Sequence, residues 1–313
     1  MNTVPAASII VPSYRGVTRL PALFDSLAAQ QEGTPAFEVI VVIDGIDDGS
    51  VALCTQENRI DVRHILFPEN RGRVAALNAG FEAARGNVLI RCDDDLLPSP
   101  QYVAGHVRAH AEENVGVVGL YLNRYEDTRY AEVYGKDSDS HFRAGAYAAE
   151  ESMRWRYWAG NCSITRAQWD SVGPYDPRYR LYGWEDVDYG YRMAAAGHRI
   201  ILASELETVH RVAAVTTEKR AQRAAHAAAA RRLFEAKHPD HSLPPAEPSL
   251  SVWNALVILA SRSLARNPRR FGRFVDAVIP RLPKKIATKL VALAVESSAL
   301  AGFRDQKLAK EVF

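Results

Sequence analysis

Short apolar runs alternate with amphipathic segments along the first 120 residues of the chain. The run at 37–44 is apolar almost throughout, which is typical of a strand that is buried on both faces of a sheet. Strands that alternate with helices at this spacing indicate βαβ units and a parallel sheet, and therefore an α/β fold. The predicted strands are 7–12, 37–44, 62–67, 87–91 and 115–122, and the predicted helices are 19–31 and 73–84.

The remainder of the chain is less regular. Residues 123–150 are polar and rich in tyrosine, which favours a mobile loop, and a second ordered block is expected over 155–212. The Ala-rich segment 216–238 predicts a long helix, and the Pro-rich stretch 241–249 predicts a linker followed by amphipathic helices. The predicted domains are 1–215 and a helical C-terminal region over 216–313, with a break at 241–249.

Composition places the chain among soluble globular proteins. It has 313 residues, of which 47% are hydrophobic and 24% charged. Its three cysteines are widely spaced and form no metal-binding motif, which favours a reducing compartment. The N-terminus lacks the features of a secretory signal, and the longest membrane candidate, 255–260, is far shorter than the roughly 20 residues of a spanning helix. A cytoplasmic location is therefore predicted.

The net charge of +2 is distributed unevenly. From Ser251 onward twelve Lys and Arg stand against four Asp and Glu, a balance of +8, so the first 250 residues carry −6. Such an acidic body is a poor partner for nucleic acid. In the basic tail, arginines alternate with apolar residues, and two interpretations stay open. One is peripheral contact with the anionic inner face of a membrane. The other, slightly favoured, is a solvated face or a homodimer contact. The residues concerned are Arg266, Arg269, Arg270, Arg273, Phe271, Phe274, Val275 and Val278.

Three adjacent carboxylates, Asp93, Asp94 and Asp95, follow the predicted strand at 87–91. Adjacent like charges repel one another, and carboxylate oxygens suit hard cations such as Mg²⁺ and Mn²⁺. A solvated acidic turn is the alternative. Polar residues also follow the first two strands, with Ser13 and Tyr14 after one and Asp44 after the other. Ligands of parallel sheets bind at the carboxyl ends of strands, so these positions predict a nucleotide site.

Four sequence blocks, in this order and spacing, resemble the family 2 glycosyltransferases with the GT-A fold. They are "SIIVPSYRG", "VVIDGIDDGS", "NVLIRCDDDLLPSP" and "GNCSITRAQWDSVGPYDPRYRLYGWEDVDYGYRMAAAGHRI", and they span 7–212. The resemblance implies a Rossmann-like, mostly parallel sheet flanked by helices and a site for a nucleotide-diphosphate sugar.

The resemblance also implies roles for the three carboxylates. Asp93 and Asp95 correspond to the two acids of the family's DxD motif and are both expected at the metal, Mn²⁺ or Mg²⁺. Asp95 is expected to contact the ion directly, and Asp93 to meet the ribose or a metal-bound water. Asp94 takes the middle position, and His210 stands where a third metal ligand is expected. An ordinary surface or core histidine is the equal alternative for His210.

The nucleotide is expected to meet residues from three loops. Asp44 matches a family carboxylate that accepts a base N–H, most often that of uracil, so UDP is expected ahead of dTDP or GDP. Ile43 departs from the family here, because an acid is common at that position. The residues expected to line this pocket are Pro12, Ser13, Tyr14, Asp44, Arg73, Asp93 and Asp94. For Arg73, a simple surface position is the equal alternative.

A second carboxylate group, Glu185 and Asp186, matches the family's ED motif. A sugar hydroxyl is a poor nucleophile, so a general base should remove its proton. The resemblance assigns that base to Asp186, with Glu185 binding acceptor hydroxyls or orienting Asp186. Trp184 and Asn161 are expected to contact the acceptor, and aromatics such as Tyr189 suit sugar rings. The alternative is an ordinary helix N-terminus carrying acids for its dipole.

The resemblance, together with these residues, implies a metal-dependent glycosyltransferase acting on a glycan, lipid-linked or small-molecule hydroxyl, and inversion of the anomeric centre is carried over from the family. Two other functions stay open at this point. A sugar-nucleotide nucleotidyltransferase also uses a metal and a parallel sheet, although "PSYRGVTRL" is a poor phosphate loop. A non-catalytic sugar- or membrane-binding protein on a transferase scaffold is the third reading.

Overall fold

The computed structural model describes residues 4–111, 114–180, 183–211, 213–249 and 251–309. The chain forms two compact units. The first comprises residues 1–124, 143–180 and 185–211, and the second comprises 125–142, 181–184 and 212–313. The second unit therefore takes two short segments from the part of the chain predicted as the first domain.

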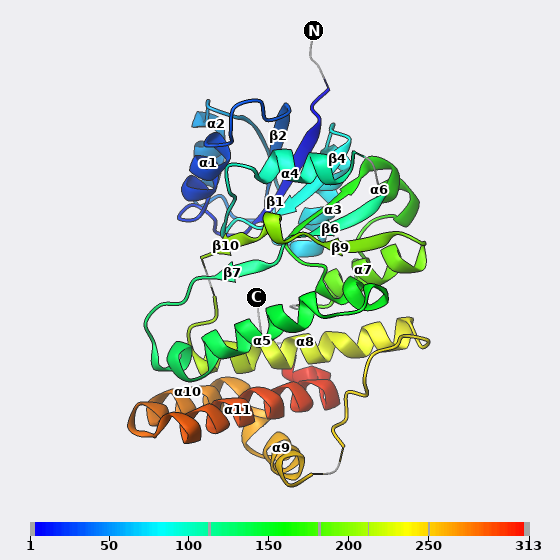
Figure 1. The fold of residues 1–313 in the computed structure, drawn as a ribbon. Coiled ribbons are helices and arrows are strands. Elements are labelled where there is room, and N and C mark those ends of the chain that lie inside the picture. Colours follow the sequence, from blue (N-terminus) through cyan, green and yellow to red (C-terminus); the bar gives the residue numbers. More distant parts are fainter. Residues whose placement is uncertain (1–3, 112–113, 181–182, 212, 250, 310–313) are drawn as a thin grey trace. The chain divides into compact units, whose positions relative to one another are not determined.

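A seven-stranded sheet with the order β3-β2-β1-β4-β8-β6-β9 forms the centre of the first unit (Figure 1). Strands β3, β2, β1 and β4 are parallel, whereas β8 runs antiparallel to both β4 and β6. The predicted α/β fold with a mostly parallel sheet is confirmed. The strands are β1 (Ala7–Ser13), β2 (Phe37–Ile43), β3 (Asp61–Leu66), β4 (Val88–Cys92), β6 (Val115–Val118), β8 (Asn161–Thr165) and β9 (Arg199–Leu202).

Strand β2 shows why the apolar run has no polar face. Val39 and Val41 belong to a core cluster with α1, α2 and α4, whereas Ile40 and Val42 belong to a cluster with α3. Successive side chains of a strand point to opposite faces, so a strand covered on both faces needs apolar residues at every position. The helices of this unit are α1 (Leu20–Ala28), α2 (Ser50–Gln56), α3 (Arg73–Ala83), α4 (Tyr102–Ala109), α6 (Arg166–Val172) and α7 (Glu185–Ala195), with short 3₁₀ helices at Glu151–Tyr157 and Ser204–Leu206.

A second, three-stranded sheet connects three segments that are far apart in the sequence. Strand β10 (Thr208–His210) lies between β5 (Leu96–Leu97), to which it is antiparallel, and β7 (Tyr121–Asn123), to which it is parallel. This pairing sets His210 opposite Leu96 and Asn123. A histidine more than a hundred residues away is thereby brought to the acidic cluster.

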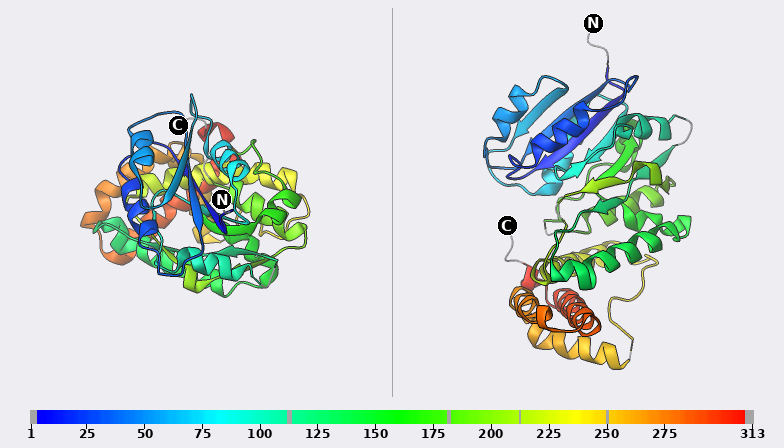
Figure 2. Two further views of the ribbon diagram at one scale, coloured as in Figure 1. Left: turned by 90° about the horizontal axis from the view of Figure 1, so that it is seen from above. Right: turned by 60° about the vertical axis from the view of Figure 1, so that its left-hand side comes forward.

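The second unit is helical, and its long helices lie side by side in Figures 1 and 2. Its core combines Phe271 and Val275 of α10 with Ala287, Val291 and other small apolar residues of α11. Thr216 and Ser251 cap the first turns of α8 and α9 with their side-chain oxygens. The helices are α8 (Thr217–Lys237), α9 (Val252–Arg262), α10 (Pro268–Val278) and α11 (Lys284–Arg304), with short 3₁₀ helices at Leu264–Arg266, Ile279–Arg281 and Gln306–Ala309.

The structure differs from three sequence predictions. Residues 123–150 are largely helical, with a π-helical turn at Ala131–Gly135 that continues into α5 (Lys136–Tyr147). The strand predicted at 115–122 is two strands, β6 and β7, in different sheets. The longest membrane candidate is not 255–260, because α11 is long and apolar enough to cross a membrane by length and composition. Half of its most apolar stretch is buried inside the protein, as in the core helix of many soluble proteins.

Candidate functional site

Three neighbouring parallel strands of the first unit end at the same edge of the sheet. Strand β1 ends at Ser13, β2 ends just before Asp44, and β4 ends just before Asp93. The backbone N–H of Asp44 donates to the Ser13 carbonyl at 2.8 Å, so the two strand ends are directly joined. This edge is where a parallel sheet is expected to bind a ligand.

The middle acid of the cluster is engaged inside the fold. Asp94 is 7% exposed and accepts hydrogen bonds from the Ser13 hydroxyl at 2.7 Å and from two nitrogens of Arg19, each at 2.8 Å. Burial raises the pKa of Asp94, and the Arg19 guanidinium opposes that rise. A paired carboxylate of this kind holds the loop after β1 to the end of β4. This geometry favours a structural role for Asp94 over the predicted contact with the nucleotide.

Asp95 faces a histidine across the small sheet. The Asp95 Oδ2 atom lies 3.1 Å from Nε2 of His210, and Nδ1 of that ring lies 2.5 Å from Oδ1 of Asn123. The His210 ring also stacks on Tyr121 with centroids 4.9 Å apart. Although burial opposes it, the His210 contact keeps the pKa of Asp95 below its ordinary value. The structure therefore brings together Asp95 and His210, two of the three residues that the sequence predicts as metal ligands, and the metal itself stays a prediction.

Asp93 and Asp186 are joined by one buried cation. Arg91, whose side chain has no solvent exposure, donates from Nε to Asp93 Oδ1 at 3.0 Å and from Nη1 to Asp186 Oδ1. The two carboxylates, by contrast, are 18% and 16% exposed, so both remain accessible. Burial raises the pKa of Asp186, and the charge of Arg91 counteracts that rise. The acid after β4 and the proposed base at the start of α7 thus share one fixed guanidinium.

Gly160 lies against Asp93 and leaves no room for a side chain. A Cβ atom on Gly160 would lie 2.3 Å from both the carboxylate of Asp93 and the hydroxyl of Tyr121. The Gly160 carbonyl also accepts the backbone N–H of Asp93 at 3.0 Å. Only glycine permits this close approach, so residue 160 helps to fix the position of Asp93.

Glu185 is the least satisfied acid of the site. It is 2% exposed, and its Oε2 atom has no hydrogen-bond partner among the residues that the structure describes. Its other oxygen lies 3.5 Å from Nη1 of Arg73, whose side chain is 44% exposed. Burial, together with the charge of Asp186, raises the pKa of Glu185 to about 7. A buried oxygen without a partner is costly, and an incoming hydroxyl would satisfy it.

Asp44 anchors the loop that precedes α3. Its carboxylate accepts the backbone N–H groups of Arg71 at 2.7 Å and Gly72 at 2.9 Å, and the residue is 4% exposed. Carboxylate oxygens each carry two lone pairs, so these bonds leave room for a further donor. The predicted contact with a base stays a prediction.

Two residues that are predicted to contact the acceptor have side chains engaged by other parts of the fold. Asn161 is fully buried, with its amide donating to the Leu206 carbonyl at 2.8 Å and to Thr208 Oγ1 at 3.0 Å, which favours a structural role. Trp184 belongs to the second unit, where its ring packs on Phe234 with centroids 5.1 Å apart. Tyr189 is also structural, because it is fully buried and stacks on Tyr175.

Asp188 of helix α7 is engaged away from the site acids. Asp188 is fully buried and accepts from Arg192 Nε at 3.0 Å and from the Tyr179 hydroxyl at 3.2 Å. It therefore holds α7 to the preceding segment rather than facing Asp186.

The donor atoms fit a divalent cation only in part. The described residues contain no group of three or more His, Cys, Asp and Glu side chains that could hold a metal ion. They offer the pair Asp95 and His210, which are 21% and 15% exposed. Mg²⁺ is usually bound by one or two carboxylates together with phosphates of the substrate. A two-residue site of this kind fits an ion whose remaining ligands arrive with a diphosphate.

Sequence reasoning missed several residues of this site. Arg91 and Arg19 organise the acids, and Asn123 orients His210. A buried ion pair at Arg91 could have been predicted from the sequence, because a charged residue inside the apolar run "VLIRC" requires buried partners. Asn123 had no such signal, since its neighbour in space is set by the small sheet. Arg15, with a φ of 52°, shows backbone strain of the kind that clusters at functional sites.

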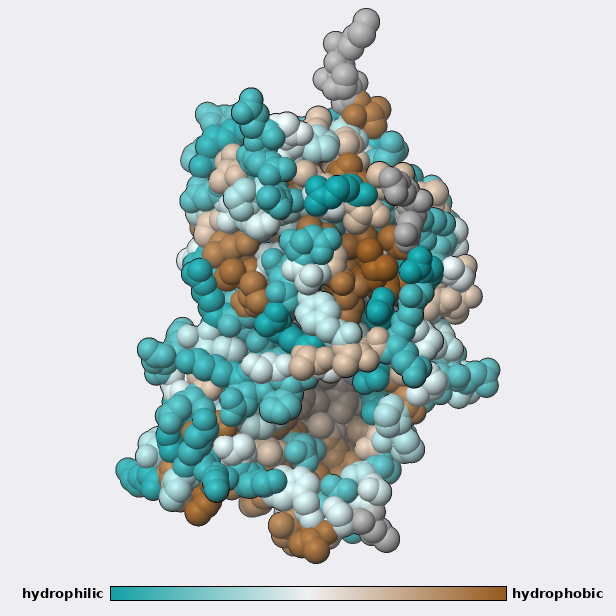
Figure 3. Space-filling model, viewed as in Figure 1, coloured by the Kyte–Doolittle hydropathy of each residue, from teal (hydrophilic) through white to brown (hydrophobic). Residues whose placement is uncertain are grey.

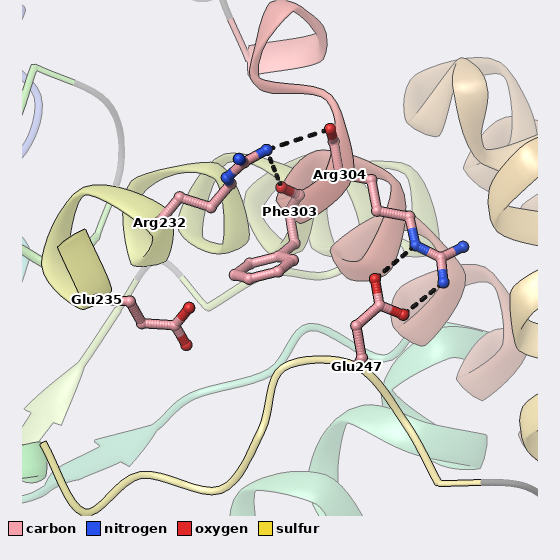
Figure 4. A pocket seen from close by; sticks show the side chains of 5 residues that line it. All are labelled: Arg232, Glu235, Glu247, Phe303 and Arg304. Atoms are coloured by element: carbon pink, nitrogen blue, oxygen red, sulfur yellow. Dashed lines mark hydrogen bonds and ion pairs between the residues drawn. The ribbon is translucent and has the colours of Figure 1, made fainter. Parts of the chain in front are cut away.

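A cavity of about 400 Å³ lies within the second unit (Figure 4). Arg304 in its wall pairs with Glu247, and Arg232 donates to the backbone carbonyls of Phe303 and Arg304. Its lining, completed by Glu235, contains none of the predicted site residues. Arg232 and Arg304 therefore connect α8, α11 and the segment before α9 through these contacts.

Comparison with known proteins agrees with the geometry. The family model of glycosyl transferase family 2 matches residues 8–167, and a model described as the N-terminal domain of galactosyltransferase matches residues 140–218. An uncharacterized glycosyltransferase, YfnE of Bacillus subtilis, is 29% identical over 65% of this chain and 64% of its own length. Validoxylamine A glucosyltransferase of Streptomyces hygroscopicus subsp. jinggangensis is 28% identical over 64% of this chain and 54% of its own. The chain thus spans less than two thirds of these relatives.

Solved structures show the same fold. The mannosyltransferase PcManGT of Pyrobaculum calidifontis, in complex with GDP-Man and Mn²⁺, aligns over 96% of this chain and 88% of its own with a TM-score of 0.63 and 20% identity. TarS of S. aureus (residues 1–349), in complex with UDP-GlcNAc, aligns over 98% of this chain and 93% of its own with a TM-score of 0.55 and 15% identity. The family model covers just over half of the chain, and the fold agrees with it. The chain belongs to glycosyl transferase family 2.

Proposed function

We propose that this protein is a metal-dependent, inverting glycosyltransferase that moves a sugar from a nucleotide-diphosphate donor to a hydroxyl group. The observation that carries the proposal is the guanidinium of Arg91, which joins Asp93 after β4 to Asp186 at the start of α7. A donor-side acid and an acceptor-side acid are thereby held at one point. Transfer between two substrates requires such an arrangement.

The donor would lie at the strand ends of the first unit. Asp44 and the residues after β1, Ser13 and Tyr14, would border the base and ribose, with UDP expected ahead of dTDP or GDP. Asp95 and His210 would hold Mn²⁺ or Mg²⁺, which when bound stabilises negative charge on the departing diphosphate. PcManGT, whose fold this chain shares, binds GDP-Man and Mn²⁺ and thus lends support to a metal.

The transfer step would be a one-step displacement. The Asp186 carboxylate takes the proton of the acceptor hydroxyl, and the acceptor oxygen forms a bond to the anomeric carbon. The bond from that carbon to the diphosphate oxygen breaks, and its electron pair leaves with the nucleoside diphosphate. Attack opposite to the leaving group inverts the anomeric configuration. Glu185, with its unpartnered oxygen, would accept a second hydroxyl of the acceptor.

The acceptor is proposed only by class. The relatives are named for different acceptors, since one glucosylates validoxylamine A and another, 34% identical over 41% of this chain, is a Yersinia pestis undecaprenyl-phosphate 4-deoxy-4-formamido-L-arabinose transferase. Glycan, lipid-linked and small-molecule hydroxyls therefore all belong in the test. We also propose a cytoplasmic location, which agrees with the free, buried state of Cys54, Cys92 and Cys162.

The test is release of nucleoside diphosphate from a panel of UDP, dTDP and GDP sugars in the presence of Mn²⁺. Each donor is combined with sugar, polyol and polyprenyl-phosphate acceptors. Release that depends on one donor and one acceptor, and that is lost in Asp186→Asn, supports the proposal. Donors that bind but yield no product with any acceptor, while pyrophosphate is released from a nucleoside triphosphate and a sugar phosphate, would favour a nucleotidyltransferase instead.

A further inference from the structure

Helix α9 presents an apolar face to solvent. Val252, Leu256 and Leu259 are 85%, 48% and 65% exposed, and they repeat at the spacing of one face of a helix. Leu264, in the turn that follows, is 57% exposed. Figure 3 shows hydrophobic surface at the lower edge of the second unit, where Figure 1 places α9. Exposed leucines that stand singly are ordinary, but a continuous row of them indicates a binding surface.

The apolar residues are concentrated in this part of the chain. Six of the eleven large hydrophobic side chains that are exposed in the described residues lie between Val252 and Ile286. The opposite face of α9, with Val257 and Ala260, is buried and packs toward α11. The helix is therefore held in the fold by one face, and its outer face remains for a partner.

Helix α10, whose sequence first suggested a membrane surface, is occupied inside the unit. Its apolar residues Phe271 and Val275 are buried in the helical core. Arg269 and Arg273 both pair with Glu218 of α8, at 2.7 and 2.9 Å. These contacts account for these four residues by packing, and leave Phe274 of α10 exposed as a single apolar side chain. Among the described helices of this unit, α9 has the longest row of exposed apolar residues.

Cations flank the exposed row of α9. Arg262 ends the helix, and Arg266 follows it in the 3₁₀ turn; both are exposed. The Lys289 ammonium of α11 lies 4.9 Å from the ring centroid of Trp253, in the first turn of α9. Glu296, an exposed acid on α11, already accepts a hydrogen bond from Trp253 Nε1 at 2.7 Å. The border of the apolar row is therefore positively charged.

We propose that the outer face of α9 docks on an anionic lipid surface. Leucines at the level of the acyl chains and basic residues at the head groups are the features of an interfacial helix. Each Lys or Arg near an anionic surface contributes roughly 1 kcal/mol, which corresponds to about a fivefold gain in affinity. A second copy of this chain is the less suitable partner, because both copies would bring the same positively charged border to the contact, whereas an anionic surface is complementary to it.

The test is flotation of the whole protein with lipid vesicles. We expect binding to vesicles in which about one third of the lipid is phosphatidylglycerol, and little binding to pure phosphatidylcholine. Raising the salt concentration should weaken binding, because it screens the cations. Equal binding to both vesicle types, or no binding to either, overturns the proposal. A stable dimer in solution that does not float with vesicles assigns the face to a second copy and overturns it as well.

Matched variants locate the contact. Leu256→Gln with Leu259→Gln, and separately Arg262→Gln with Arg266→Gln, should each reduce vesicle binding about tenfold. Phe142→Gln is the control, because Phe142 is 56% exposed and belongs to the same unit. All of these residues are exposed, so the variants should keep the melting temperature of the parent. Equal loss in the control, or none in the leucine pair, contradicts docking through α9.

A fluorescent probe gives a readout that does not depend on transfer activity. The native cysteines are all buried, so Leu259→Cys provides the accessible thiol for an environment-sensitive label. Its emission should shift to the blue with anionic vesicles, whereas the label on Phe142→Cys should not respond. Neither assay needs a donor or an acceptor. Membrane docking can therefore be disproved while the proposed transferase activity stands, and the transferase activity can be disproved while docking stands.

Discussion

Arg91 donates to the Asp186 carboxylate from a position with no solvent exposure. The arginine comes from the central strand β4 and the aspartate from the first turn of α7, so the contact ties the two halves of the site together. The same guanidinium also holds Asp93 at 3.0 Å. Both acids are positioned by a group that touches neither substrate in the proposed reaction.

Arg91→Lys should lower turnover strongly while preserving the fold in part. A lysine keeps the charge but cannot reach two carboxylates as a planar fork does, so Asp186 loses its fixed orientation. We expect kcat to fall about 100-fold and, because Asp93 also loses its fixed partner, donor binding to weaken about tenfold. The measurement is steady-state kinetics together with donor titration. Arg63→Lys is the control, because Arg63 pairs with buried Glu38 in the same unit and lies outside the site; its kcat should stay near that of the parent.

Asp186→Asn and Asp188→Asn should separate chemistry from stability. The first removes the proposed base, so turnover should fall by a factor of about a thousand. Its loss of melting temperature should be the smaller of the two, because Asp93 still pairs with Arg91 and Asp186 is partly exposed. The second breaks the buried contacts to Arg192 and Tyr179, so the melting temperature should fall while kcat changes little. Turnover and thermal unfolding of both variants check this. Full turnover in Asp186→Asn would remove the base assignment.

Glu185→Gln should stabilise the protein in alkali and not in acid. The pKa of Glu185 is raised to about 7 in the fold, so between its unfolded value and about 7 the folded state binds more protons than the unfolded state. The contribution of Glu185 to the free energy of unfolding is therefore complete below its unfolded pKa, and it is lost as pH rises through about 7. Near pH 8 the variant should be more stable by roughly 1–3 kcal/mol, and the difference should approach zero near pH 4, below the unfolded pKa.

Urea unfolding at the two pH values measures this difference. Glu151→Gln is the control, since Glu151 is exposed and pairs with Arg199. Its difference from the parent should be small and nearly independent of pH. A Glu185→Gln variant that is less stable than the parent near pH 8 would show that the buried acid is satisfied in its charged form.

Gly160→Ala should impair activity through Asp93. The added methyl group would lie 2.3 Å from the Asp93 carboxylate, and something must move. The Asp93 side chain is the adaptable part, so we expect weaker donor binding by about tenfold and a modest loss of melting temperature. Gly145→Ala is the control, because Cβ at Gly145 meets no atom within 4 Å. Donor titration and thermal unfolding of both variants test the prediction.

The central strands are predicted well from the sequence because both faces of each strand are buried, which gives an unbroken apolar run. Residues 37–44 are apolar at successive positions, and the structure covers both faces of β2. The prediction of a loop at 123–150 was wrong because this segment buries few of its residues. Helix α5 buries only Ala146 along its length, so its sequence lacks the apolar periodicity by which a helix is predicted.

The sequence identifies which residue types form the site better than it identifies the residues that they contact. Asp93, Asp95, Glu185 and Asp186 stand out as clustered acids, and the structure brings them to one unit. The difference between Asp94 and its neighbours depends on Arg19, which no local pattern connects to it. The contact between Asp95 and His210 likewise depends on the pairing of β5 with β10, and such long-range pairing is not encoded in spacing along the chain.

Calorimetric titration of UDP, dTDP and GDP into the protein, with Mn²⁺ and with a chelator, tests the donor and metal site most directly. We expect that one diphosphate binds, that the chelator weakens binding at least tenfold, and that Asp95→Asn loses this metal dependence. Asp170→Asn, an exposed acid of the same unit, should behave as the parent. Binding of the diphosphate that is equally tight with chelator, or unchanged in Asp95→Asn, would contradict the site described here.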